Sequence, residues 1–232
     1  MTNKTKFVYA YLLSFVVFGF SNSSISDEIN QSEDDISLAY EIISLLEKRH
    51  YSKKEYEEIY SDASDIYLER LDPSRSFLLE EEVLSQYQQS GDKLLNSQLT
   101  FSFDLFKIYQ KRYEQRSKLH LALLEQIDSL NLYQDNKILV DRSEAPWFKT
   151  EEELVNLWTS QFINSVIQLL VNGNEEDEVK SKLSKQINCQ RNNFLQTRNE
   201  DVFGLFINSI ASSYDPHTSY FSPRRTEDFE IE

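Results

Sequence analysis

Few residues in this sequence have a spacing that could support catalysis. The three histidines, His50, His120 and His217, are widely separated, and none has a second histidine within the three or four residues that a helical zinc motif requires. The single cysteine, Cys189, lacks the flanking residues of a cysteine protease and is interpreted as a small helical side chain. His120 falls on an apolar helical stripe, so we interpret it as a partly buried packing residue and not as a ligand.

Glycines and acidic residues do not form a recognisable site either. The four glycines are isolated from one another, so the sequence contains neither a phosphate-binding glycine loop nor a GxSxG nucleophile turn. Acidic groups such as Asp34 with Asp35, or the run 80–82, are explained by solvated helix faces and by first helical turns. We therefore expect no catalytic residue, no metal ligand and no cofactor-binding residue in this chain.

The composition narrows both the fold and the partners. Among 232 residues, 24 are basic and 39 acidic, which gives a net charge of −15 without any cluster of Lys and Arg, so nucleic acid is not expected as a partner. Glycine and proline number four each, too few for the frequent tight turns of β-sandwiches, propellers or doubly wound sheets. We predict an all-α fold, a single irregular bundle of about seven helices that follows a signal peptide.

The first residues have the layout of a signal peptide. Lys4 and Lys6 precede an apolar run from Phe7 to Phe20, after which the residues are small and polar. As a helix this run would be about 21 Å long, whereas the roughly 20 residues needed to cross a bilayer core span about 30 Å. We divide the chain into a signal peptide at 1–23 and a helical domain at 24–232. Export with one cysteine favours a bacterial periplasm, with membrane contact only through an uncleaved signal segment anchored in the inner membrane.

Capping patterns predict where helices begin. Ser52 and Glu55 have the spacing of a capping box and predict a helix from Lys53 to about Arg70. Asn199 is expected to begin the last helix.

A second capping box, Thr150 with Glu153, predicts a helix that ends near Val171. Gly173 is placed to adopt the left-handed conformation beyond that end, and Asn174 to cap the helix that follows.

The longest helix is predicted by a stripe of side chains at alternating steps of three and four residues. The stripe consists of Phe106, Tyr109, Tyr113, Ser117, His120, Leu124 and Ile127. We expect it to face the core. Two shorter amphipathic helices are expected before it, one over Ile36–Leu46 and one, suggested by Leu79, Val83, Tyr87 and Leu94, before Gly91 and the loop that follows.

Four short segments occur in an order that resembles the N-terminal region of the bacterial tail-specific, or carboxyl-terminal processing, proteases. The resemblance runs from about residue 32 to residue 232, and the third and fourth segments are fairly specific in combination. The segments are Leu71–Phe77 (LDPSRSF), Phe103–Phe106 (FDLF) leading to Arg112 and Arg116, Asp141–Trp147 (DRSEAPW) and Asp215–Pro223 (DPHTSYFSP).

Residues of these segments are interpreted as structural, because they are turn formers after helices, a large aromatic loop anchor, and an N-cap serine followed by proline. The residues assigned in this way are Leu71, Asp72, Pro73, Asp141, Arg142, Pro146, Trp147, Asp215, Pro216, His217, Thr218, Ser222 and Pro223.

The resemblance implies a helical region that precedes a PDZ domain, which receives substrate C-termini, and a protease core with a serine nucleophile and a lysine base. No position of this sequence matches that serine, that lysine or the peptide groove, so the chain as given is not expected to be an enzyme. The helix after Trp158, where family members tend to be basic, is uncharged here. We expect Phe162, Ile163 and Val166 to enlarge an apolar packing surface instead.

Two functions are compatible with these patterns. The leading hypothesis is the scaffold and adaptor-docking domain of a periplasmic tail-specific serine protease, which degrades or trims proteins from their C-termini, here without its catalytic part. Its expected partners are the PDZ and protease domains of a parent enzyme, on a separate or missing reading frame, and an adaptor lipoprotein. The alternative is a free-standing periplasmic helical module that binds proteins and has no link to proteolysis.

Overall fold

The computed structural model is all-α, as the sequence predicts, and it describes residues 29–90, 95–132 and 137–222. These residues form seven α-helices and one short 3-10 helix, without a β-strand. The elements are α2 (Glu33–Arg49), α3 (Tyr56–Leu71), α4 (Glu80–Ser90), α5 (Leu95–Glu125), η1 (Ile127–Ser129), α6 (Glu151–Val171), α7 (Glu176–Leu195) and α8 (Asn199–Tyr214). The predicted signal peptide at 1–23 lies outside the described residues.

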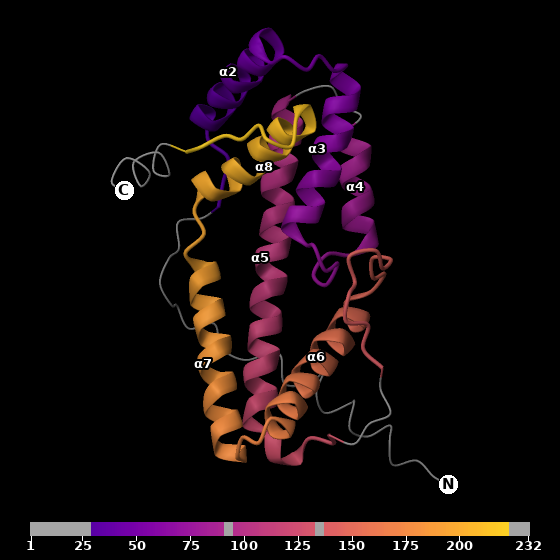
Figure 1. The fold of residues 1–232 in the computed structure, drawn as a ribbon, viewed down its shortest axis with the longest axis vertical. Helices are drawn as coiled ribbons and strands as arrows, with labels where there is room; N and C mark the ends of the chain where they lie inside the picture. Colours follow the sequence, from indigo (N-terminus) through magenta and orange to yellow (C-terminus); the bar gives the residue numbers. More distant parts are fainter. Residues whose placement is uncertain (1–28, 91–94, 133–136, 223–232) are drawn as a thin grey trace.

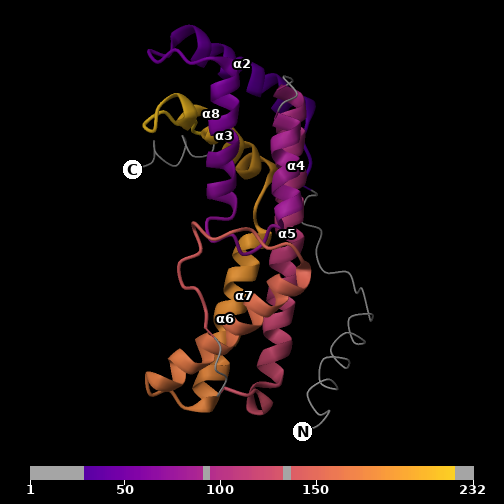
Figure 2. The same cartoon turned by 90° about the vertical axis from the view of Figure 1, so that its right-hand side faces the viewer.

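The 31-residue helix α5 runs along the length of the molecule, and the other helices pack around it in two groups (Figure 1). The N-terminal half of α5 lies among α2, α3, α4 and α8, and its C-terminal half contacts α6 and α7 (Figure 2). Residues from both ends of the sequence meet in the first group, because α3 and α8 form an extensive helix pair.

Three apolar clusters hold these helices together. The first, between α2, α3, α5 and α8, buries large side chains such as Tyr67, Phe103 and Phe203. The second joins the end of α5 to α6 and α7. The third, which we call the middle cluster, lies between the other two and consists of Phe77, Leu79, Leu154 and Trp158. Burial of these apolar surfaces supplies the main driving force for the fold.

The predicted stripe of α5 faces this interior. Phe106, Ser117 and Leu124 are buried, and Tyr109 and His120 are half-buried. The two shorter amphipathic helices are also present as α2 and α4, although Leu94 lies outside the described residues.

The capping box at Thr150 is confirmed. Thr150 Oγ1 accepts the Glu153 N–H at 3.3 Å, and the Glu153 carboxylate accepts the Thr150 N–H at 3.0 Å. Asn199 begins α8 as predicted. A further capping box, between Ser32 and Asp35 at the start of α2, was not identified from the sequence.

The capping box predicted at Ser52 is wrong. Helix α3 begins at Tyr56, with Glu55 as a cap residue that makes no side-chain cap bond. The Ser52 N–H instead donates to Nδ1 of His50 at 3.1 Å. The residues after α2 are therefore folded around the histidine ring, and helix formation starts only beyond them.

The turn between α6 and α7 confirms one prediction and corrects another. Gly173 adopts a φ of 83°, in the left-handed region. Asn174, however, does not cap α7, whose N-cap residue is Glu175. The Asn174 side chain donates to the Leu169 carbonyl at 2.7 Å, so it closes α6 instead.

Helix α6 is long and apolar enough to span a membrane by length and composition, and no other helix of the described ranges is. Its buried face is part of the fold, because Leu154, Trp158, Phe162 and Val166 pack toward α5 and α7. Two of the residues expected on an apolar surface, Phe162 and Val166, are thus internal, whereas Ile163 is half-buried.

The two described glycines give a matched test of the backbone. Gly173→Ala should lower the free energy of unfolding by about 1 kcal/mol, because an L-residue is strained at this φ. Gly204→Ala should raise it by about 0.5–1 kcal/mol, because Gly204 lies inside α8 with open space where a Cβ would be. Urea unfolding followed by circular dichroism measures both, and effects of the same sign would contradict this assignment.

Candidate functional site

The first three motif segments meet beside the middle of α5. Arg75 Nη1 donates to the Ala145 carbonyl at 2.7 Å, and Arg142 Nη2 lies 3.4 Å from the Arg75 carbonyl oxygen. The guanidinium of Arg116, from α5, lies 4.4 Å from the ring centroid of Phe77. Segments that are separated by tens of residues therefore form one structural unit.

Asp72 organises the loop that joins α3 to α4. It is 1% exposed, and its carboxylate accepts the backbone N–H groups of Ser76, Phe77 and Leu78 at 2.9, 2.8 and 3.0 Å. Burial raises the pKa of Asp72, and these three hydrogen bonds together with the charge of Arg116 oppose the rise. The carboxylate thus replaces the backbone partners that a loop would otherwise lack. Leu71 is buried just before it and Pro73 is exposed just after it.

This loop contains a strained residue. Arg75 has a φ of 45°, and no other non-glycine residue in the described ranges has a positive φ. The next carbonyl, of Ser76, accepts the indole N–H of Trp158 at 2.8 Å. The strain is held by contacts with Ala145 on one side and with α6 on the other.

Phe77 fills the middle cluster. Its ring centroid lies 4.7 Å from that of Tyr109, 5.6 Å from that of Tyr113 and 6.1 Å from that of Trp158. Aromatic pairs at these separations add to the free energy of simple burial. One side chain therefore connects the α3–α4 loop to both α5 and α6.

The third segment is a folded loop that approaches α6. Asp141 Oδ1 accepts the N–H and the hydroxyl of the residue two positions later, at 3.0 and 2.8 Å. Arg142 Nη2 donates to the Pro146 carbonyl at 3.3 Å. The half-buried ring of Trp147 lies 5.4 Å from the guanidinium of Arg75, close enough for a cation–π contact.

The fourth segment lies elsewhere, against the corner between α2 and α3. His50 Nδ1 lies 3.1 Å from the Ser52 nitrogen and 3.3 Å from the Ser52 carbonyl oxygen, and its Nε2 forms a hydrogen bond with Thr218 Oγ1 at 2.9 Å. The Tyr51 hydroxyl donates to the carboxylate of Asp215, and this bond lowers the pKa of Asp215.

The remaining residues of the fourth segment make a surface turn. Pro216 and His217 are exposed, and Ser222 is half-buried. Pro223 lies outside the described residues. The structure thus brings the first three motif segments together and places the fourth one apart from them.

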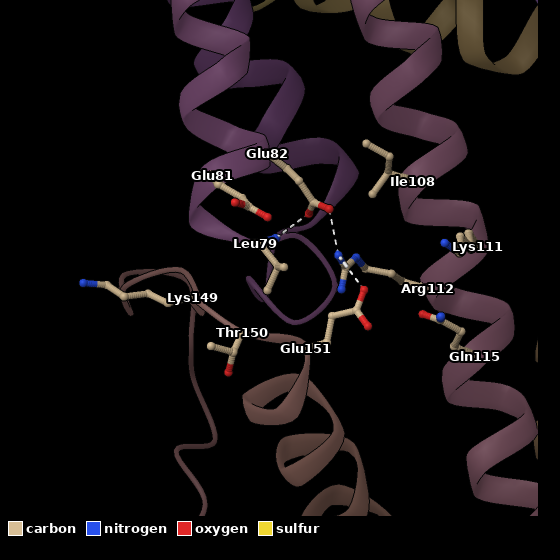
Figure 3. Close-up of a pocket in the computed structure, with 10 residues that line it drawn as sticks. All are labelled: Leu79, Glu81, Glu82, Ile108, Lys111, Arg112, Gln115, Lys149, Thr150 and Glu151. Atoms are coloured by element: carbon tan, nitrogen blue, oxygen red, sulfur yellow. Dashed lines mark hydrogen bonds and ion pairs between the residues drawn. The ribbon is translucent and has the colours of Figure 1, made fainter. Parts of the chain in front are cut away.

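A hollow of about 430 Å³ adjoins the motif segments (Figure 3). It is lined by the starts of α4 and α6 and by the middle of α5. Its residues are Leu79, Glu81, Glu82, Ile108, Lys111, Arg112, Gln115, Lys149, Thr150 and Glu151.

The buried charge in this hollow was not identified from the sequence. Arg112 is 5% exposed, and its Nη2 donates to Glu82 Oε1 at 2.7 Å. Glu82 Oε2 in turn accepts the Leu79 N–H at 2.7 Å, which ties the α3–α4 loop to α5. The four-residue spacing of Arg112 and Arg116, beside the apolar stripe, is the sequence signal that could have indicated it.

The chemically versatile side chains have structural surroundings. His120 is half-buried and donates through Nε2 to the Trp158 carbonyl at 3.0 Å. Burial and the charge of Arg116 lower the pKa of His120 to about 4, so the ring is neutral at physiological pH. Cys189 is exposed on α7. Across the described ranges, no group of three or more His, Cys, Asp and Glu residues is arranged to hold a metal ion.

Replacement of the buried acceptor gives a direct test of the loop. Asp72→Asn should lower the free energy of unfolding by about 2 kcal/mol, because the amide NH₂ faces a backbone N–H that then has no acceptor. Asp141→Asn is the control, since Asp141 also accepts a backbone N–H but is exposed, and it should cost under about 0.5 kcal/mol. Equal losses in urea unfolding would contradict the assigned role of Asp72.

The depressed pKa of His120 predicts a specific loss of stability in acid. The unfolded chain binds a proton near pH 6.5 and the folded chain only near pH 4, so stability falls as the pH drops through this window. Between about pH 7 and pH 4.5 the wild type should lose about 2 kcal/mol more than His120→Gln, which keeps a side-chain N–H donor. Urea unfolding at both pH values measures the difference, and parallel losses would refute it.

Comparison with known proteins identifies the family. Residues 42–224 match the family model described as "Tail specific protease N-terminal domain". This range includes all four motif segments. A "Tail-specific protease" of Haemophilus influenzae is 31% identical over 189 residues, which are 79% of this chain. The same match spans 27% of the length of that relative. The catalytic domains of the family are not part of the match. The chain therefore belongs to the tail-specific protease family and contains its N-terminal domain.

Proposed function

We propose that this chain is the non-catalytic scaffold of a periplasmic tail-specific protease and that it acts by packing against the PDZ and protease domains. The observation that carries this proposal is the family match over residues 42–224, which covers the helical fold. The signal-peptide layout of residues 1–23 and the single cysteine support a periplasmic location. The family relationship is also the basis for proposing an adaptor lipoprotein as a second partner.

One flank of α6 is suited to contact the catalytic domains. Ile163, Ile167 and Val171 follow one another at steps of four residues, and we call them the α6 flank. Val171 is 77% exposed, while Ile163 and Ile167 are half-buried and belong to none of the three apolar clusters of the described residues. The helix has no charged residue from Leu154 to its end, in a chain of net charge −15. An uncharged apolar flank on an acidic protein favours contact with another polypeptide.

A free-standing binding module remains the second candidate. The observation that favours it is the extent of the internal core, because three apolar clusters are formed by residues of this chain alone. The two functions differ in whether the chain binds a catalytic partner.

Association with the catalytic part separates the two functions. We expect the full chain to bind the PDZ and protease polypeptide encoded by the same genome, as measured by analytical ultracentrifugation. Ile163→Lys combined with Ile167→Lys should weaken this binding at least tenfold, because each ammonium group would be desolvated in the interface.

The matched control is Asn164→Lys combined with Gln168→Lys, which adds the same two charges at exposed positions of the same helix. It should leave the binding unchanged, and circular dichroism should show that all variants are folded. The absence of such a polypeptide, or of binding by the wild type, would favour the free-standing module.

A further inference from the structure

Arg112 has hydrogen-bonding capacity that the fold does not use. Its Nη2 contacts Glu82 at 2.7 Å and lies 3.5 Å from Glu151. Its Nε and Nη1 are buried and have no hydrogen-bond partner within the part of the chain that the structure describes. A guanidinium is always charged and carries five N–H donors, so unpaired donors at a buried position are costly. Such a group at the wall of a hollow indicates a missing acceptor.

Three basic side chains, of Lys111, Arg112 and Lys149, and three acidic ones, of Glu81, Glu82 and Glu151, line the hollow around this guanidinium. Figure 3 shows Arg112 directed toward the space between Leu79, Thr150 and Glu151. Helices α4 and α6, of 11 and 21 residues, both begin at its edge, and helix N-termini favour negative charge. Lys111 also lines the hollow.

The two glutamates that contact Arg112 differ in how firmly they are held. The Glu82 side chain is 15% exposed and is fixed by its bonds to Arg112 and to the Leu79 N–H. The Glu151 side chain is 66% exposed, and its single contact with Arg112 is the longer one. Glu82 is therefore part of the structure, whereas Glu151 is a weakly held occupant that another carboxylate can displace.

We propose that Arg112 binds a carboxylate group of another polypeptide in this hollow, in the place that Glu151 occupies. The two oxygens of a carboxylate match two parallel N–H groups of a guanidinium, and Arg112 has N–H groups that the fold leaves unpaired. When Glu151 turns outward, three cations line the hollow, Lys111, Arg112 and Lys149, against Glu81 and Glu82.

Two further features limit the ligand. Lys149 forms an ion pair with Glu80, in which Nζ and Oε2 lie 3.7 Å apart, so Arg112 supplies the main attraction for a carboxylate ligand. A hollow of about 430 Å³ accepts a side chain or a chain end but not a folded domain. The ligand is thus an acidic side chain or a C-terminal carboxylate.

Acetate is the probe that tests this site. We expect a titration of the full chain with sodium acetate to give saturable NMR shifts of the backbone amides of Leu79 and Glu151, which chloride at equal ionic strength does not give. Glu151→Gln should tighten acetate binding at least threefold, because the side chain that competes with acetate for Arg112 then has no charge. Arg112→Lys should weaken it at least tenfold, because the charge is kept but the paired N–H geometry is lost.

The matched control is Glu152→Gln, which removes the same charge from the same exposed turn and should change the affinity by less than 1.5-fold. The comparison of Glu151→Gln with Glu152→Gln decides the question even if Arg112→Lys does not fold. Absence of saturation in both the wild type and Glu151→Gln, identical shifts with chloride, or equal tightening by both glutamate variants would overturn the proposal.

Two peptides distinguish the sources of the carboxylate. One has an internal glutamate and an amidated end, and the other has a free C-terminus and no acidic side chain. Competition with acetate by either peptide supports the proposal and identifies the source. A site that takes acetate but neither peptide overturns the assignment to a polypeptide ligand.

Discussion

The turn at Asp72 is the constraint on which the arrangement of the helices depends. A buried carboxylate that accepts three consecutive backbone N–H groups fixes the path of the chain between α3 and α4. That path places Phe77 against α5 and α6 and directs the Ser76 carbonyl to Trp158. The two groups of helices along α5 are thereby joined through one loop. The pKa of Asp72 is raised, so this order is obtained against a desolvation penalty that burial of the surrounding aromatic rings offsets.

A second buried charge, that of Arg112 on α5, has a different character. Arg112 and Glu82 connect α5 to the start of α4, and removal of either partner would leave an uncompensated buried charge. The pair leaves part of the guanidinium unused and borders a hollow. A position that serves only stability is expected to satisfy its donors, so this surplus is the reason to associate the hollow with a ligand.

Two of the histidines in the described residues take part in contacts between helices and motif segments. His120 is held neutral between α5 and α6, and His50 connects the residues after α2 to Thr218 of the fourth motif segment. These surroundings agree with the N-terminal, non-catalytic part of a tail-specific protease.

Sequence patterns were sufficient to predict the helical class, the capping box at Thr150, the inward stripe of α5 and the left-handed Gly173, because each depends on residues within a few positions of one another. They did not predict that Ser52 fails to cap a helix, that residues 71–77 meet residues 141–147, or that Arg112 is buried against Glu82. The last two outcomes depend on contacts between distant positions, and the first depends on the His50 ring, which accepts the Ser52 N–H. Local spacing carries no information about such contacts, since they are fixed only when the apolar surfaces of the helices are buried together.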